Sequence, residues 1–129
     1  MLLAQCRIAA LVEGALLFRH NVQYELRAWA LMPNHAHTLF RTFDVPMWRI
    51  VDAWKGYTGK QANRILGRKG QFWQEGYWDT YMRNDEHELK TRHYIESNPV
   101  RANLVKNAKD WPWSSARFRD DYGRLCLPA

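Results

Sequence analysis

The stretch VQYELRAWALMPNHAHTLFRTF, residues 22–43, predicts the β-hairpin around which the rest of the chain is organised. Over residues 22–32 apolar side chains fall at every second position, which is typical of a strand with one buried face. Pro33-Asn34 then predicts a turn, because the fixed φ of proline suits a turn position. The chain returns as a second strand over residues 35–43. The residues expected on the buried face of the first strand are Val22, Tyr24, Leu26, Ala28 and Ala30.

Two histidines, His35 and His37, stand at the start of the second strand. Side chains at i and i+2 project from the same face of a strand, whereas a helix would separate them by about 200°. Two neutral imidazoles on a rigid element suit a divalent metal ion, with positions left for a third protein group and a substrate oxygen. The competing interpretation is that both histidines only cap and line the hairpin. Arg41 is expected on the same face, where it either meets a phosphate or belongs to a solvated edge.

The composition indicates a basic protein of one domain. The chain has 129 residues, enough to bury a core of its own. Its 19 Lys and Arg against 13 Asp and Glu give a formal net charge of +6. A surplus of this size favours a polyanionic partner, most often nucleic acid. The alternative is a basic surface that serves solubility alone.

Cysteine usage and hydropathy exclude several classes of protein. Cys6 and Cys126 stand alone at opposite ends of the chain, which predicts reduced thiols and neither a disulfide framework nor a zinc site. Arg7 and Glu13 interrupt the apolar beginning, so it does not have the pattern of a signal peptide. No apolar run approaches the roughly 18 residues of a membrane span. We therefore expect a soluble, cytoplasmic protein.

The sequence predicts two helices, one before and one after the hairpin. Apolar residues spaced by three and four predict a helix over residues 1–19, ending near Asn21, a residue that tolerates a left-handed stop. The same spacing predicts a second helix over residues 47–66. Five basic residues lie on and after it, where they either favour the helix dipole or form a rim that contacts DNA phosphates. They are Lys55, Lys60, Arg64, Arg68 and Lys69.

The second half of the chain adds a strand and a helix. We expect a short strand over residues 79–83 and then a helix over residues 86–97, capped by Asn84 or Asp85. Asn98-Pro99 should interrupt this helix, because the residue before a proline is pushed out of the helical region, and a short helical turn should follow over residues 100–104. The tail from residue 111 should pack over the body of the protein.

Tyr94 and Asn98 lie four residues apart, so on a helix they share one face. A tyrosine can act as a nucleophile on phosphorus when a metal or a base assists its hydroxyl. Asn98 can supply an oxygen as a third metal ligand, and a set of imidazole and oxygen ligands suits Mg²⁺ or Mn²⁺ when a phosphate completes the shell. The competing interpretations are that Tyr94 is a core residue and that Asn98 caps the next turn. If Asn98 points away, the candidates for third ligand are His93, Glu75 and Asp79.

Several of these motifs together resemble one family. MPNHAH at residues 32–37 and YIESNPVRANL at residues 94–104 are similar to the REP-associated tyrosine transposases. These belong to the single-tyrosine transposases of small insertion sequences, within the HUH endonucleases. QFWQEGYWD at residues 71–79 and WPWSS at residues 111–115 resemble the same family, so the likeness extends over about residues 22–118.

The resemblance implies a role for each site residue. His35 and His37 match the metal-binding pair, and Asn98 matches the polar residue that completes the metal site with Mg²⁺ or Mn²⁺. Tyr94 matches the nucleophile that attacks single-stranded DNA, leaving a 5′-phosphotyrosine and a free 3′-hydroxyl. The implied partners are hairpin-forming DNA elements that are cut on one strand.

The implied fold is α+β: a ferredoxin-like antiparallel sheet with helices packed on it. Relatives begin with a strand before the first helix, whereas here Met1 opens directly on the helix. We therefore expect a sheet that lacks this first strand and has an exposed edge, which invites pairing with a second copy in a homodimer.

Three functions follow as hypotheses. The first is a metal-dependent enzyme that cleaves and rejoins single-stranded DNA through Tyr94. The second is a hairpin-DNA-binding protein derived from such an enzyme that is no longer catalytic. The third is a metal-dependent hydrolase that activates water, in which the tyrosine takes no part.

Overall fold

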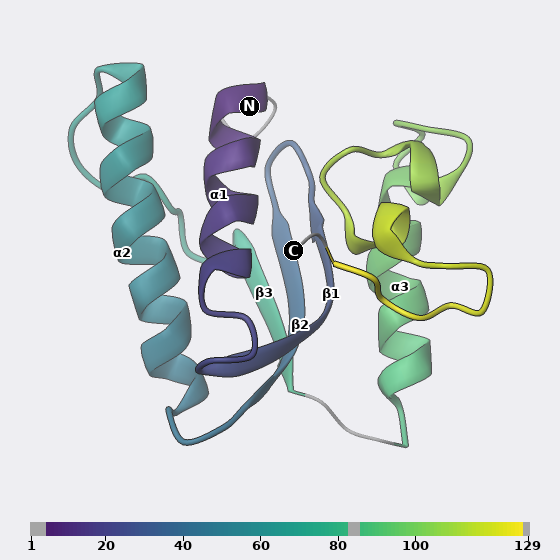
Figure 1. Ribbon diagram of the computed structural model, residues 1–129. Coiled ribbons are helices and arrows are strands. Elements are labelled where there is room, and N and C mark those ends of the chain that lie inside the picture. The colour runs from purple at the N-terminus through teal and green to yellow at the C-terminus, as the bar shows by residue number, and fades with distance from the viewer. Residues whose placement is uncertain (1–4, 83–85, 128–129) are drawn as a thin grey trace.

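The computed structural model describes residues 5–82 and 86–127, which form three layers (Figure 1). The first two helices cover one face of a central sheet, and the third helix and the C-terminal segment lie against the other. The elements in chain order are α1 (Cys6–Phe18), β1 (Tyr24–Leu31), β2 (Ala36–Thr42), α2 (Met47–Leu66), β3 (Trp78–Met82), α3 (Glu88–Arg101) and the short 3₁₀ helices η2 (Ala108–Asp110) and η3 (Ser115–Phe118).

The α+β class is confirmed, but the sheet is mixed and not wholly antiparallel as predicted. Its strand order is β1-β2-β3. The hairpin makes β1 antiparallel to β2, while β3 runs parallel to β2. The parallel pairing follows from the connection. As in a βαβ unit, α2 carries the chain back along the sheet between β2 and β3, so β3 starts from the same end of the sheet as β2. Pairing with a second copy remains a prediction.

A bulge in β1 changes which side chains face each layer. The register shifts between Leu26 and Ala28, so Arg27 has no partner residue on β2. Before the bulge Leu26 packs into the core under α1 and α2; after it, Ala28 packs on the α3 side. The predicted single face from Val22 to Ala30 is therefore wrong beyond Leu26, because one extra residue moves every later side chain to the opposite face. It is also wrong at Val22, which lies before β1 and is exposed.

The larger core lies between the sheet and the first two helices, and it is rich in aromatic rings. Trp54 of α2 stacks at 5.6 Å on Trp78 of β3. Its indole N–H donates to Tyr24 Oη at 3.1 Å, and this hydroxyl donates to the carbonyl of Leu16 on α1. Each buried polar atom in this set has a partner, which is the condition for burying Trp and Tyr at low cost.

The ends of the first two helices agree with the prediction. α2 spans Met47–Leu66 as expected and stops at Gly67 with φ of 66°, the left-handed conformation that glycine adopts freely. After α1, Asn21 takes a positive φ of 66°, which is the predicted left-handed stop.

The third helix differs from the prediction at its C-terminus. α3 continues through Pro99 to Arg101 instead of breaking at Asn98-Pro99. A proline inside a helix removes one N–H donor, but here the helix ends two residues later and Pro99 is buried. Tertiary packing therefore outweighs the local preference. The predicted caps, Asn84 and Asp85, lie outside the described residues.

The C-terminal segment packs over the body, as predicted, and part of it lies along the edge of β1 that is not paired with β2. The N–H of Leu31 donates to the carbonyl of Trp113 at 2.8 Å, and Ala30 forms a β-bridge with Ser114. The indole of Trp111 donates to the carbonyl of Leu31 at 3.0 Å.

Within the described ranges, no helix has the length and apolarity that crossing a bilayer would require.

Candidate active site

The two histidines lie side by side where the hairpin enters β2. Their rings are stacked at a centroid distance of 5.7 Å and an angle of 13°. The backbone between Met32 and His35 closes the turn, with the N–H of Met32 donating to the carbonyl of His35 at 2.7 Å. Ala36 points into the larger core on the opposite face. The prediction that both imidazoles share a face is confirmed.

Tyr94 and Asn98 of α3 meet this pair across an open hollow of about 400 Å³. The hollow is lined by His35 and His37 from the hairpin and by Tyr94 and Asn98 from the helix. The Tyr94 side chain is 47% exposed, so the competing interpretation of a core residue is wrong. Asn98 lies inside α3, so it does not cap a following turn. Residues about 60 positions apart in the sequence therefore share one cavity, which is the arrangement that the motifs predicted.

Arg101 is a site residue that sequence reasoning missed. Its guanidinium lies over the Tyr94 ring, 4.2 Å from the centroid, and Arg101 lines the same hollow. Its Nη2 donates to the Tyr94 carbonyl at 2.7 Å and to Asn98 Oδ1 at 2.5 Å. Arg101 follows Tyr94 by seven residues, or two helical turns, so spacing alone would place both on one face. The expected break at Pro99 hid this signal.

Asp79 approaches the histidines from the neighbouring strand. It stands opposite His37 in the β2–β3 register, and its Oδ2 lies 3.4 Å from His37 Nδ1. The geometry is not that of a hydrogen bond, and His37 Nδ1 is buried without a hydrogen-bond partner. Burial lowers the pKa of His37; the charge of Asp79 opposes this shift, while His35 and Arg101 add to it. His37 is therefore neutral near pH 7, the form in which imidazole binds metal.

The donor atoms in the hollow fit a divalent metal ion. Two imidazoles and an amide oxygen are ligands that Mn²⁺ and Mg²⁺ accept when water and phosphate complete the shell. Two buried polar atoms, His37 Nδ1 and Asn98 Nδ2, have no hydrogen-bond partner, which is common at sites that bind something further. Across residues 5–82 and 86–127, no three His, Cys, Asp or Glu side chains gather as a metal-binding group. Of the alternative third ligands, Asp79 lies 3.4 Å from His37 Nδ1, whereas His93 and Glu75 do not line the hollow.

The predicted DNA-contacting residues lie away from this hollow. Lys55 and Lys60 line a separate open groove of about 700 Å³ between α2 and the segment that follows it, together with Glu75. Arg68 lies over the ring of Phe72 at 5.9 Å. Arg41 is exposed at the end of β2 and lies over Phe43 at 5.3 Å. Arg64 and Lys69 are exposed near the end of α2.

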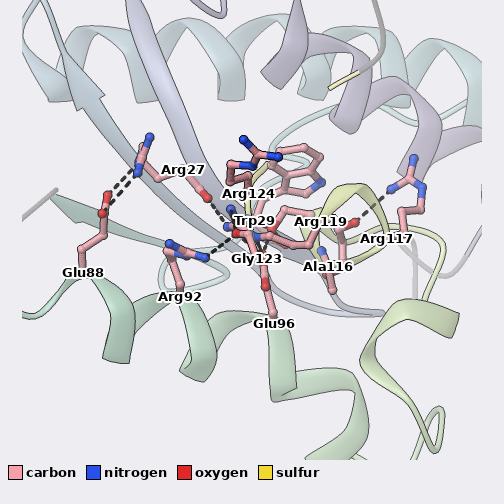
Figure 2. A network of polar contacts seen from close by, with 12 residues as sticks. Arg27, Trp29, Glu88, Arg92, Glu96, Ala116, Arg117, Arg119, Gly123 and Arg124 are labelled. Atoms are coloured by element: carbon pink, nitrogen blue, oxygen red, sulfur yellow. Dashed lines mark hydrogen bonds and ion pairs between the residues drawn. The ribbon is translucent and has the colours of Figure 1, made fainter. Parts of the chain in front are cut away.

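A network of ion pairs and hydrogen bonds fastens α3 to the rest of the protein on its other side (Figure 2). Glu96 accepts from Ser115 Oγ at 2.5 Å and from Arg119 Nε at 3.0 Å. Arg27, the bulged residue of β1, donates to Glu88 at 2.7 Å near the start of the helix. Because these contacts hold α3 at two points, they position Tyr94 relative to the histidines.

Comparison with known proteins places the chain in a family. The fold and the meeting of the histidine pair with Tyr94 are those that the resemblance to the single-tyrosine transposases implied. The family model described as "Transposase IS200 like" matches residues 15–98, and the chain belongs to this family.

Two relatives sharpen the assignment. A REP-associated tyrosine transposase of Escherichia coli K12 is 30% identical over 110 residues, covering 81% of this chain and 61% of the relative. A Haemophilus influenzae protein named as a member of the same group is 29% identical over 103 residues, covering 71% of this chain and 58% of the relative. The chain thus spans about three-fifths of the length of these relatives. No solved structure gives a significant match.

Proposed function

We propose that this protein cleaves and rejoins single-stranded DNA, with Tyr94 as the nucleophile. The observation that carries the proposal is that the Tyr94 side chain shares one open hollow with the stacked His35 and His37. A phenol exposed beside two imidazoles has both the access and the neighbours that attack on phosphorus requires.

In the proposed reaction, Tyr94 Oη attacks the phosphorus of a DNA phosphodiester. A bond forms between Oη and phosphorus, and the bond from phosphorus to the 3′ oxygen breaks. The products are a 5′-phosphotyrosine and a free 3′-hydroxyl, and the phenolic proton is balanced by the proton that the 3′ oxygen takes up. Because the new ester has about the energy of the old one, a 3′-hydroxyl can attack it and rejoin the strand.

His35, His37 and Asn98 would hold Mg²⁺ or Mn²⁺, which when bound supplies positive charge to the scissile phosphate. His37 is held neutral by burial, which lowers its pKa, so its ring nitrogens are available as ligands. The role of the hairpin is to keep the two imidazoles parallel, because both follow the tight turn between Met32 and His35.

For the DNA partner we propose single-stranded elements that form hairpins, the partner that the resemblance to the REP-associated tyrosine transposases implies. The formal charge of +6 supports a polyanionic substrate. The basic residues on the α2 side, including the half-buried Lys55 and the exposed Lys60 in their groove, are the proposed contacts for phosphates distant from the cut.

The experiment is a search for a covalent adduct. The protein is incubated with hairpin-forming single-stranded oligonucleotides and Mn²⁺, and the mixture is run on a denaturing gel. We expect an adduct with the wild-type protein and none with Tyr94→Phe or with EDTA. Tyr122→Phe is the matched control, because Tyr122 is 85% exposed and lies outside the hollow. An adduct that persists in Tyr94→Phe would falsify the role of Tyr94.

Other outcomes identify the alternatives. Metal-dependent cleavage without any adduct indicates a hydrolase, and tight binding without cleavage indicates an inactive DNA-binding protein. Binding is also measured against salt: if several Lys and Arg contact phosphates, the logarithm of the affinity falls linearly with the logarithm of salt concentration. A flat response would mean that the basic surface takes no part in binding.

A further inference from the structure

The hollow contains one side chain with a fixed positive charge, and its role is not explained by the metal ligands or the nucleophile. Of the described residues that line it, Arg101 alone is a permanent cation. The two histidines beside it carry no fixed charge, and Asp79, whose Oδ2 lies 3.4 Å from His37 Nδ1, does not line the hollow. A phosphodiester entering the hollow therefore meets its main protein-borne positive charge at Arg101.

The contacts of Arg101 orient it without using up its donors. Both of its hydrogen bonds to the protein, to the Tyr94 carbonyl and to Asn98 Oδ1, come from Nη2. Within the described residues Nε and Nη1 make no hydrogen bond, so three N–H donors of the planar fork stay available. Asn98 Oδ1 has a second lone pair, so its bond to the guanidinium does not prevent it from binding a metal.

The position of the guanidinium over the ring links it to the nucleophile. It lies 4.2 Å from the centroid of Tyr94 and is tied to the backbone of the same residue. Its position relative to the phenol is thus set within one helix, two turns apart. A phosphate bound by Nε and Nη1 of Arg101 therefore lies beside the tyrosine whose hydroxyl attacks it.

We propose that Arg101 is a catalytic residue that binds the non-bridging oxygens of the scissile phosphate. As the bond from Tyr94 Oη to phosphorus forms and the bond to the 3′ oxygen breaks, negative charge on those oxygens increases, and the guanidinium stabilises it. In rejoining, the same charge stabilises the phenolate that leaves. This role rests on the proposed function of Tyr94.

The test compares a charged and a neutral phosphate. Adduct formation is measured under single-turnover conditions on an oligonucleotide with either a phosphate or a methylphosphonate at the position that the wild-type protein cuts. Arg101→Ala should react about 100- to 1,000-fold more slowly than wild type on the phosphate, the usual effect of removing one preorganised donor from such a site. Binding of the oligonucleotide should weaken by about tenfold, the value of one charge-assisted phosphate contact, which is far less than the loss of rate.

On the methylphosphonate the ratio of wild-type to Arg101→Ala rates should fall to within about tenfold, because a neutral phosphoryl group has less charge to stabilise. A ratio that is equal on both substrates would overturn the proposal, since a merely structural role of Arg101 would slow both alike. Arg49→Ala is the matched control: Arg49 also lies over an exposed aromatic ring, 5.6 Å from the centroid of Trp48, but on α2 and outside the hollow.

A second measurement does not depend on cleavage. Inorganic phosphate is titrated into the protein and followed by NMR at the backbone amides of α3. Phosphate should bind to wild type and to Arg49→Ala, and at least about tenfold more weakly to Arg101→Ala, as expected for loss of a charge-assisted contact. Equal binding to all three would overturn the proposal. If phosphate binding depends on Arg101 but Tyr94 forms no adduct, the proposed nucleophile fails while Arg101 stands as the phosphate ligand.

Discussion

The two sides of α3 differ in how completely their polar groups are used. On the side facing β1 and the C-terminal segment, Glu96 and Arg119 bond to each other with side chains only 15% and 8% exposed. Arg119 also donates to the carbonyl of Arg27. On the side facing the hairpin, Tyr94 is 47% exposed, and buried nitrogens of His37 and Asn98 have no hydrogen-bond partner.

This difference indicates a division of tasks within one helix. A buried charge pair that is broken destabilises a protein strongly, so the network around Glu96 is expected to hold the helix in place. Buried polar atoms without partners cost free energy, and they persist where a ligand supplies the missing partner. One side of α3 therefore maintains the fold, and the other keeps donors and acceptors available for substrate and metal. Arg92 is a partial exception: its Nη2 donates to Gly123, but its Nε has no partner.

The largest expected effect comes from removing an imidazole. His37→Leu should lower the rate of adduct formation about 1,000-fold, because a bound metal is worth several kcal/mol of charge stabilisation and each 1.4 kcal/mol is a factor of ten. The free energy of unfolding should stay the same or rise, since the substitution removes a buried nitrogen that lacks a partner. Rates and urea denaturation are measured side by side. A variant that loses stability as well would contradict the division.

The opposite pattern is expected for Glu96→Ala. It should lower the free energy of unfolding by about 3 kcal/mol, because Arg119 stays buried without its carboxylate partner. Urea denaturation measures the change, and Lys90→Ala is the control on an exposed position of the same helix. Where the variant is still folded, Mn²⁺ affinity should fall far less than in His37→Leu, because His35 and His37 keep their places on the hairpin. A stability equal to that of the control would show that the network does not hold α3.

A smaller effect is expected for Ser115→Ala. The hydroxyl of Ser115 bonds to Glu96 and to the backbone of Trp29, so it joins α3 to β1. Its removal should cost about 1 kcal/mol, the usual net value of a hydrogen bond. In the double variant Ser115→Ala/Glu96→Ala, the loss in free energy of unfolding should be smaller than the sum of the losses in the two single variants, because both remove the same Ser115–Glu96 hydrogen bond. Strict additivity in denaturant melts would argue against one connected network.

The smallest effect is expected at His20, which lies between α1 and β1 and is not part of either side of α3. Its Nδ1 accepts from the N–H of Leu26 at 3.0 Å, and burial lowers its pKa, with Glu25 opposing. The unfolded chain therefore binds a proton more readily than the folded one, so stability from this group is complete above its unfolded pKa of 6.5 and falls as the pH drops below it. Melting temperature from pH 8 to pH 5 measures this. In His20→Asn that part of the pH dependence should disappear, and its persistence would assign it to another group.

Local patterns predicted much of the fold, and they failed where long-range contacts decide. The bounds of α2 and the left-handed stop at Asn21 follow from periodicity and from residue chemistry. The bulge at Arg27 could not be predicted from the sequence, because nothing in the alternation of β1 shows that Glu88, far along the chain, binds the Arg27 side chain. The helical continuation through Pro99 likewise depends on burial of this residue.

For the site, the sequence by itself determined the chemistry: two imidazoles on one strand face, and a phenol and an amide one helical turn apart. Only the tertiary structure decided that these two sets meet in one hollow, that Arg101 joins them, and that β3 runs parallel to β2. The physical reason is range. Spacing along a strand or helix is set by backbone geometry within a few residues, whereas the meeting of a hairpin and a distant helix depends on how whole layers pack and on which buried charges find partners.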